Sequence, residues 1–115
     1  NMDFPKRGEI WIVSLEPVKG SEIGKTRPAL VISNNRNNAF SETITILPIT
    51  SNTLKVYPFE VFLSNKETKL KNDSKVKCNQ IRTIDKKRFL DFLCIVSSEI
   101  MEEVRKALLI HLDMN

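Results

Sequence analysis

The sequence predicts one mainly β domain that ends in a single helix. Its 115 residues are the length of one domain, residues 1–115. Short runs of apolar and β-branched residues alternate with turn-forming clusters over most of the chain, and helical spacing of apolar residues appears only after residue 97. Many short strands followed by one amphipathic helix are typical of a strongly bent sheet or small barrel that the helix covers.

The apolar and alternating runs define the expected strands. These are residues 10–15, 28–33, 43–47, 58–63, 75–84 and 90–96. The second strand is apolar on both faces, so its outer face must be covered by the helix or by another subunit. Residues 34–38, four asparagines and an arginine, predict a polar turn. Pro48 cannot donate a ladder hydrogen bond, so its strand should lie at an edge or bulge there.

The helix prediction depends on caps and on one apolar stripe. Ser97 and Ser98 are good N-cap residues. Glu102 and Lys106 have the spacing of an i, i+4 ion pair. The stripe consists of Ile100, Val104, Ala107, Leu108 and His111.

Composition limits the partners. The net charge of +4 favours a polyanion such as nucleic acid. No apolar run approaches the roughly 20 residues that span a bilayer. No leader pattern indicates export, so we expect a cytoplasmic protein without a membrane partner. Asn1, which precedes Met2, is expected to be foreign to the native chain, and Cys78 and Cys94 are expected to be reduced thiols.

Several chemistries are disfavoured by the residues. The segment 20–26 ends in Gly-Lys-Thr, but it is one residue short of a P-loop and precedes a strand instead of a helix. His111 is the single histidine, so a catalytic histidine pair is excluded. Cysteine, histidine and carboxylate residues show no metal-ligand spacing, and no serine has an evident base. We therefore expect no metal and no cofactor.

Arg27 is the residue that best indicates chemistry. It lies where a polar loop with two glycines, residues 16–26, meets the apolar strand. Its planar, permanently charged guanidinium is suited to holding a phosphate or carboxylate through two hydrogen bonds.

Six segments together resemble the MazF/PemK toxins, from about Arg7 to the last helix. They are Trp11, residues 20–22, 27–31, 48–51, 57–61 and 73–85. The resemblance implies an SH3-like barrel of the MazF/PemK/CcdB type and a homodimer with RNA in a groove across the interface. It also implies a sequence-specific, metal-independent endoribonuclease that cleaves single-stranded mRNA, and a cognate antitoxin. Its basic groove suits an antitoxin with an acidic, disordered segment.

The resemblance also implies the catalytic residues. Arg27 and Thr50 match the catalytic arginine and threonine of the family, and Glu22 matches a glutamate with a catalytic part in some members. The ribose 2′-OH would attack its own 3′-phosphate, which leaves a 2′,3′-cyclic phosphate and a free 5′-OH. The enzyme then has to position the phosphate and stabilise its charge, which an arginine fork can do. Whether Glu22 or Arg27 moves the proton stays open.

Further RNA contacts are inferred from position. The loops 16–26 and 51–57 could close over a splayed single strand. The expected contacts are Ser21, Lys25, Asn52 and Lys55 on these loops, together with Asn79, Gln80 and Arg82.

Two other classes remain open at this stage. One is a CcdB-like poison that binds DNA gyrase and catalyses nothing. The other is a non-catalytic RNA-binding barrel. Incubation with single-stranded RNA in EDTA separates them, because only a metal-independent ribonuclease cuts.

Overall fold

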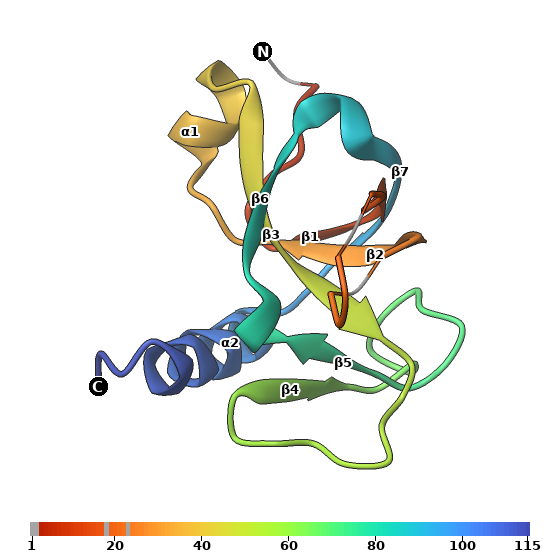
Figure 1. The fold of residues 1–115 in the computed structure, drawn as a ribbon, viewed down its shortest axis with the longest axis vertical. Coiled ribbons are helices and arrows are strands. Elements are labelled where there is room, and N and C mark those ends of the chain that lie inside the picture. Colours follow the sequence, from red (N-terminus) through yellow and green to blue (C-terminus); the bar gives the residue numbers. More distant parts are fainter. Residues whose placement is uncertain (1–2, 18, 23) are drawn as a thin grey trace.

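The computed structural model describes residues 3–17, 19–22 and 24–115, and the expectation about Asn1 falls outside these ranges. Figure 1 shows the fold. Its strands are β1 (Glu9–Ser14), β2 (Thr26–Val31), β3 (Thr43–Thr50), β4 (Glu60–Leu63), β5 (Ser74–Lys77), β6 (Arg82–Asp85) and β7 (Phe89–Ile95). Its helices are α1 (Asn35–Phe40) and α2 (Ser98–His111), with 3₁₀ turns η1 (Cys78–Gln80) and η2 (Lys86–Arg88).

The strands form one bent antiparallel sheet with β3 at its centre. The order is β4-β5-β3-β2-β1-β7, and β6 also pairs with β3. In the described part of the chain, the end strands β4 and β7 have no pairing with each other, so the sheet stays open instead of closing into a barrel. The expected class, mainly β with a C-terminal helix, is confirmed.

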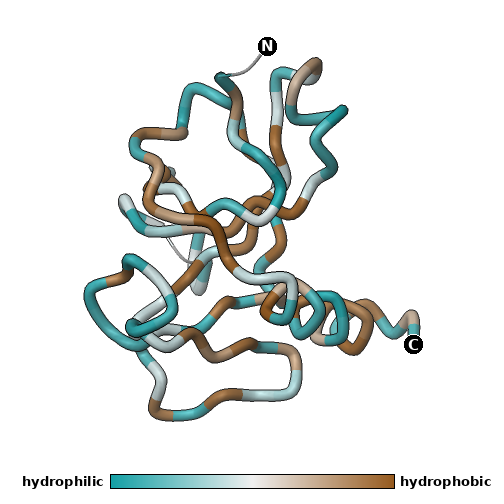
Figure 2. The backbone as a smooth tube through the Cα atoms, turned by 180° about the vertical axis from the view of Figure 1, so that it is seen from behind, coloured by the Kyte–Doolittle hydropathy of each residue, from teal (hydrophilic) through white to brown (hydrophobic). Residues whose placement is uncertain are grey.

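The two faces of the sheet bury two separate hydrophobic clusters. On β1, Ile10 lies in the cluster beneath α2, whereas Val13, and Leu15 just after the strand, lie in the cluster inside the bend of the sheet. On β2, Leu30 joins the first cluster and Ala29 the second. Figure 2 shows hydrophobic residues gathered where the strands cross and along α2. Because successive side chains of a strand point to opposite faces, the same strands contribute residues to both clusters.

Helix α2 packs against β4 and η1 and closes the cluster to which the outer face of β2 contributes. Its buried residues Ile100, Val104 and Ala107 lie in the same cluster as Leu30. Ser97 caps the helix, accepting a hydrogen bond from the Ile100 N–H at 3.1 Å. The apolar outer face of β2 thus needs no second subunit to cover it.

The predicted polar turn at 34–38 is wrong, because these residues begin α1. The Asn34 side chain caps the helix by accepting a hydrogen bond from the Asn37 N–H at 2.8 Å. Asn38 is fully buried, donates to the Ser33 carbonyl at 2.9 Å and accepts from the Ser33 hydroxyl at 2.5 Å. These bonds offset the low helix propensity of asparagine.

The expectation that Pro48 lies at an edge or bulge is also wrong. Pro48 is buried in central strand β3, opposite Ala29 of β2. On the other side of β3, pairing with β6 ends at Ile46 and pairing with β5 begins at Ile49. Pro48 occupies this gap, where no ladder bond to β5 or β6 has to be made.

The expected strand 75–84 is two strands. Ile46 of β3 pairs with Arg82 of β6, and Ile49 pairs with Val76 of β5. Between these two pairs the chain from β5 to β6 has more residues than β3 does. The extra residues form the 3₁₀ turn η1. The two strands consequently bury residues in different clusters: Val76 lies in the cluster beneath α2, and Ile84 lies in the other.

The ion pair expected on α2 is replaced by a neighbouring one. Glu102 pairs with Arg105, one turn along at i, i+3, with an N–O distance of 2.7 Å, and not with Lys106. Both side chains are about half exposed, so the pair contributes little to stability.

Candidate nucleic-acid site

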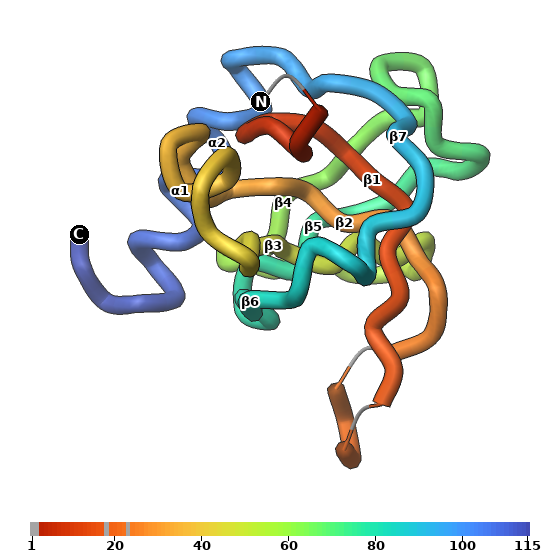
Figure 3. Tube along the Cα trace, turned by 90° about the horizontal axis from the view of Figure 1, so that it is seen from above, coloured from red at the N-terminus to blue at the C-terminus, as the bar shows by residue number. Residues whose placement is uncertain are grey.

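The loop between β1 and β2, residues 15–25, carries the first group of candidate residues. Figure 3 shows its described parts projecting away from the sheet. The loop closes at its base, where the Leu15 N–H donates to the Lys25 carbonyl at 2.9 Å. Lys25 itself has a φ of 67°, in the left-handed region, and its side chain is exposed. Its N–H donates to the Glu16 carboxylate.

Arg27 and Thr50 lie together in one pocket. The register of β2 and β3 ends at Ala29 opposite Pro48. Arg27 lies two residues before Ala29, and Thr50 lies two residues after Pro48. Because side chains two residues apart on a strand point to the same face, Arg27 and Thr50 share one face of the sheet. Both line a pocket of about 290 Å³, together with Ser51, Lys71 and Asn72.

The guanidinium of Arg27 is oriented by the loop. Its Nε donates to the Gly24 carbonyl at 2.8 Å. Among the described residues this is its one hydrogen bond, so its terminal nitrogens keep their donors for a ligand. Thr50 is half-buried, and its Oγ1 accepts from the Asn52 N–H at 3.3 Å. Its own O–H is left to donate.

A second pocket holds most of the predicted RNA contacts. Ser21, Glu22, Asn79, Gln80 and Arg82 line a cavity of about 480 Å³. The residues after position 78 arrive there because η1 turns the chain away from the sheet before β6 begins. Arg82 is half-buried, and its Nη1 approaches the Leu15 carbonyl at 3.5 Å, the limit of a hydrogen bond.

Glu22 is not placed with Arg27 and Thr50. It is exposed in the second pocket, and its Oε1 accepts from the Lys19 N–H at 2.7 Å. The structure thus groups Glu22 with the predicted RNA contacts. A catalytic role for it requires movement of the loop.

The other loop candidates lie outside both pockets. Asn52 and Lys55 are exposed on the loop between β3 and β4, residues 51–59. The Asn52 Oδ1 accepts from the Leu54 N–H at 3.3 Å, and the Lys55 carbonyl accepts from the Lys75 ammonium at 2.6 Å. Both side chains are exposed where a long ligand would extend beyond the Arg27 pocket.

Lys71 is a candidate that sequence reasoning missed. It is exposed and lines the Arg27 pocket from the connection between β4 and β5. Only the excess of lysines in residues 66–71 signalled it in the sequence. It adds a second cation beside the place where a phosphate would bind.

Other reactive groups lie apart from these pockets. Burial, and then the nearby Glu60 charge, raise the pKa of the Cys78 thiol to about 12, so it is not a nucleophile at neutral pH. No group of three or more potential metal ligands occurs among residues 3–17, 19–22 and 24–115. Within the same ranges, no helix has the length and apolar character to cross a membrane.

Comparison with known proteins supports a family assignment. Residues 6–112 match the family described as PemK-like, MazF-like toxin of type II toxin–antitoxin system. The chain is 45% identical to Endoribonuclease MazF9 of Mycobacterium tuberculosis over 114 residues, which cover 95% of this chain and 97% of the relative. A crystal structure of MazF from Deinococcus radiodurans superposes with a TM-score of 0.83 at 31% identity, covering 96% and 98% of the two chains. A MazE–MazF structure from the same organism gives 0.77 at 30% identity, covering 96% and 97%. The chain therefore belongs to the PemK-like, MazF-like toxins of type II toxin–antitoxin systems.

Proposed function

We propose that this toxin is a metal-independent endoribonuclease that cleaves single-stranded mRNA at specific sequences. The observation that carries the proposal is the shared pocket of Arg27 and Thr50 at the diverging ends of β2 and β3. The relative from M. tuberculosis is named an endoribonuclease, which agrees with it.

The pocket suits attack of a ribose 2′-OH on its own 3′-phosphate. The new bond joins O2′ to phosphorus, and the bond from phosphorus to the 5′ oxygen of the next nucleotide breaks. The products are a 2′,3′-cyclic phosphate and a free 5′-OH. Arg27 stabilises the phosphorane charge through its terminal nitrogens, and the Thr50 O–H donates to a non-bridging oxygen. Lys71 adds positive charge to the same pocket.

Proton transfer is the step that the pocket does not complete by itself. Arginine holds its proton too tightly to be a good base. Glu22 lies in the neighbouring pocket. In this proposal Glu22 takes the 2′-OH proton after the β1–β2 loop has closed over the RNA, and water protonates the departing 5′ oxygen to give the free 5′-OH.

The second pocket supplies base recognition. Asn79 and Gln80 present amide groups and Arg82 a guanidinium, and these groups read base edges. Ser21 adds a hydroxyl from the loop. Asn52, Lys55 and Lys25 contact the strand on either side of the cut.

The partners follow from the same surface. Solved structures of MazF with MazE, at 27–30% identity, show the toxin fold together with an antitoxin. We extend this to a cognate antitoxin whose acidic, disordered segment places carboxylates near Arg27. The active toxin is a homodimer, and it acts in the cytoplasm, where its mRNA substrate is found. A second copy would cover apolar side chains that are at least half exposed on edge strand β7, at Leu90, Phe92 and Ile95.

One assay tests the function. The protein is incubated with a long single-stranded RNA in EDTA, the cut sites are mapped, and a substrate with 2′-deoxyribose at the cut nucleotide is compared. We expect cleavage of the RNA, cyclic phosphate ends, and no cleavage of the deoxy substrate, because the nucleophile is missing. Intact RNA would favour a gyrase poison, and a mobility shift without cleavage would favour a simple RNA-binding protein.

A further inference from the structure

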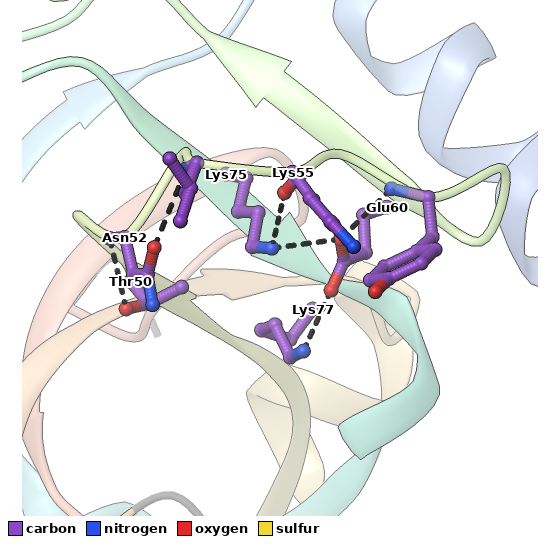
Figure 4. A network of polar contacts seen from close by, with 8 residues as sticks. Thr50, Asn52, Lys55, Glu60, Lys75 and Lys77 are labelled. Atoms are coloured by element: carbon purple, nitrogen blue, oxygen red, sulfur yellow. Dashed lines mark hydrogen bonds and ion pairs between the residues drawn. The ribbon is translucent and has the colours of Figure 1, made fainter.

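A buried charge network lies beneath the loop 51–59 and is not part of either pocket. The Glu60 side chain is fully buried. Its Oε1 lies 2.9 Å from the Lys75 ammonium, and its Oε2 lies 2.6 Å from that of Lys77. Burial alone would raise the pKa of the Glu60 carboxyl, but hydrogen bonds from Lys77, the Tyr57 N–H and Lys75 outweigh it and hold the pKa below its ordinary value. Figure 4 shows the network.

The network is attached to the main chain of the loop at two points. The Lys75 ammonium donates to the Lys55 carbonyl at 2.6 Å, and the Tyr57 N–H donates to Glu60 Oε1 at 3.0 Å. The Lys75 ammonium also lies 5.8 Å from the centre of the Tyr57 ring. One lysine and one glutamate thus hold the second half of the loop.

Lys75 also connects the loop to the candidate catalytic strand. It is the residue of β5 directly opposite Thr50 of β3. From Thr50 the chain continues through local hydrogen bonds, first from the Asn52 N–H to Thr50 and then from the Leu54 N–H to Asn52. The loop is therefore fixed at its start by Thr50 and in its middle by Lys75, as Figure 4 shows.

Hydrophobic burial does not fix the middle of this loop, although Phe59 at its end stacks on Tyr57 and lies near His111 of α2. Leu54 is 90% exposed, and Val56 and Tyr57 are 43% and 46% exposed. A buried ion pair adds little net stability compared with apolar residues of the same size. What it supplies to this loop is two specific hydrogen bonds with the main chain.

We propose that Lys75, neutralised by Glu60, is a positioning residue that holds the loop 51–59 so that Asn52 and Lys55 meet the RNA. This rests on the proposed function, because it assumes that the loop contacts RNA. Lys75 does not contact RNA itself, since its side chain is only 8% exposed and its ammonium is already bonded to Lys55 and Glu60. Loss of its ammonium frees the loop, and RNA binding then has to order it again.

The test uses Lys75→Met, which keeps the aliphatic stem and leaves Glu60 paired with Lys77. Lys66→Met is the matched control, because it removes one charge from an exposed lysine outside both pockets. Hydrogen exchange of the free protein should show the amides of 51–59 exchanging at least about tenfold faster in Lys75→Met, with the rest unchanged. Lys66→Met should match the wild type, and Lys75→Arg should restore most of the protection.

RNA binding supplies the second readout, with an uncleavable 2′-deoxy substrate analogue. We expect Lys75→Met to weaken binding by about tenfold, the cost of ordering a few loop side chains. The slope of log affinity against log salt should stay that of the wild type. Lys55→Ala, which removes an exposed cation, should lower that slope by about 0.7. When Asn52 is already alanine, Lys75→Met should reduce RNA affinity by a smaller factor than it does in the wild-type background. The reason is that one of the contacts positioned by Lys75 is then already missing.

Three results would overturn the proposal. They are unchanged exchange in the loop, a salt slope that falls in Lys75→Met as for a direct phosphate contact, and strict additivity with Asn52→Ala. Should the methionine variant fail to fold, Lys75→Gln replaces it in every measurement. The exchange experiment needs no RNA, so failure of the wild type to cleave would count against the proposed function alone.

Discussion

Replacing Arg27 by alanine is the most direct perturbation of the proposed site. Arg27 is half-buried and lies in the pocket with Thr50, and its Nε bonds to the Gly24 carbonyl. The substitution therefore removes two things. One is the pair of terminal nitrogens proposed to hold the phosphate, and the other is the hydrogen bond that joins Arg27 to Gly24 of the β1–β2 loop.

The two losses differ in free energy, and we expect the first to lower kcat and the second to raise KM. Loss of a donor to transition-state charge costs about 3 kcal/mol, a factor of at least about 100 in kcat. Loss of the single bond to Gly24 costs about 1 kcal/mol, a few-fold in KM. Since Arg27 contributes no apolar group to either core cluster, the melting temperature should fall by less than about 5 °C.

Steady-state cleavage of a short fluorogenic RNA, together with circular dichroism, measures all three quantities. Arg27→Lys should recover little kcat, because a point charge does not replace a planar fork. Thr50→Ser, which keeps the hydroxyl, serves as the control that retains most of the activity. A folded Arg27→Ala protein with kcat within a few-fold of the wild type would refute the assignment.

The other predictions concern assembly, inhibition, acid stability and thiol reactivity. Light scattering at micromolar concentration should give a homodimer, and a stable monomer would contradict this. A saturating antitoxin fragment should displace an uncleavable RNA, whereas simultaneous binding at full affinity would exclude a shared surface. The pKa of Glu60 is lowered from its ordinary 4.5, so its contribution to stability is complete above that pH and is lost as the pH falls through the lowered value. The gap in melting temperature between wild type and Glu60→Gln should accordingly narrow below pH 4.5 and stay constant above it. At pH 8 a maleimide should label the partly exposed Cys94 in the native protein and reach buried Cys78 only in denaturant.

The elements that could be predicted are those whose signal is local. β1 and β2 alternate as expected, because each buries residues on two faces. Helix α2 begins after Ser97, as its cap residue indicates. In these segments the residue pattern and the tertiary environment favour the same structure.

The elements that could not be predicted depend on distant partners. Helix α1 forms from asparagines because buried Asn38 bonds to Ser33, a contact that no local propensity contains. The break at Cys78–Gln80 appears only when β3 is given two partners on one edge. Pro48 is tolerated in the central strand for the same reason. It lies where β3 changes its partner from β6 to β5, so no ladder hydrogen bond is required from its nitrogen.

The candidate site divides in the same way. That Arg27 and Thr50 lie together is what the family resemblance implies, and the register of β2 and β3 is consistent with it. The separation of Glu22 from them, and the presence of Lys71 beside them, depend on how the long loops fold back. Loop side chains carry no periodic signal that would have placed them.

Strand β3 determines the geometry of the proposed active site, and core residues determine where β3 lies. Ile46 is buried in the cluster inside the bend, and Leu47 is buried in the cluster beneath α2. A slip of one residue against β2 would exchange these two environments and would move Thr50 to the face opposite Arg27. Two buried clusters make such a slip costly, because Ile44, Ile46, Leu47 and Ile49 of β3 would each be displaced into the wrong cluster. The position of Arg27 and Thr50 in one pocket is consequently maintained by apolar residues such as Ile46 and Leu47 that line neither candidate pocket. Substitutions such as Leu47→Ala are expected to reduce activity through stability and register, with no change in the chemistry of the pocket itself.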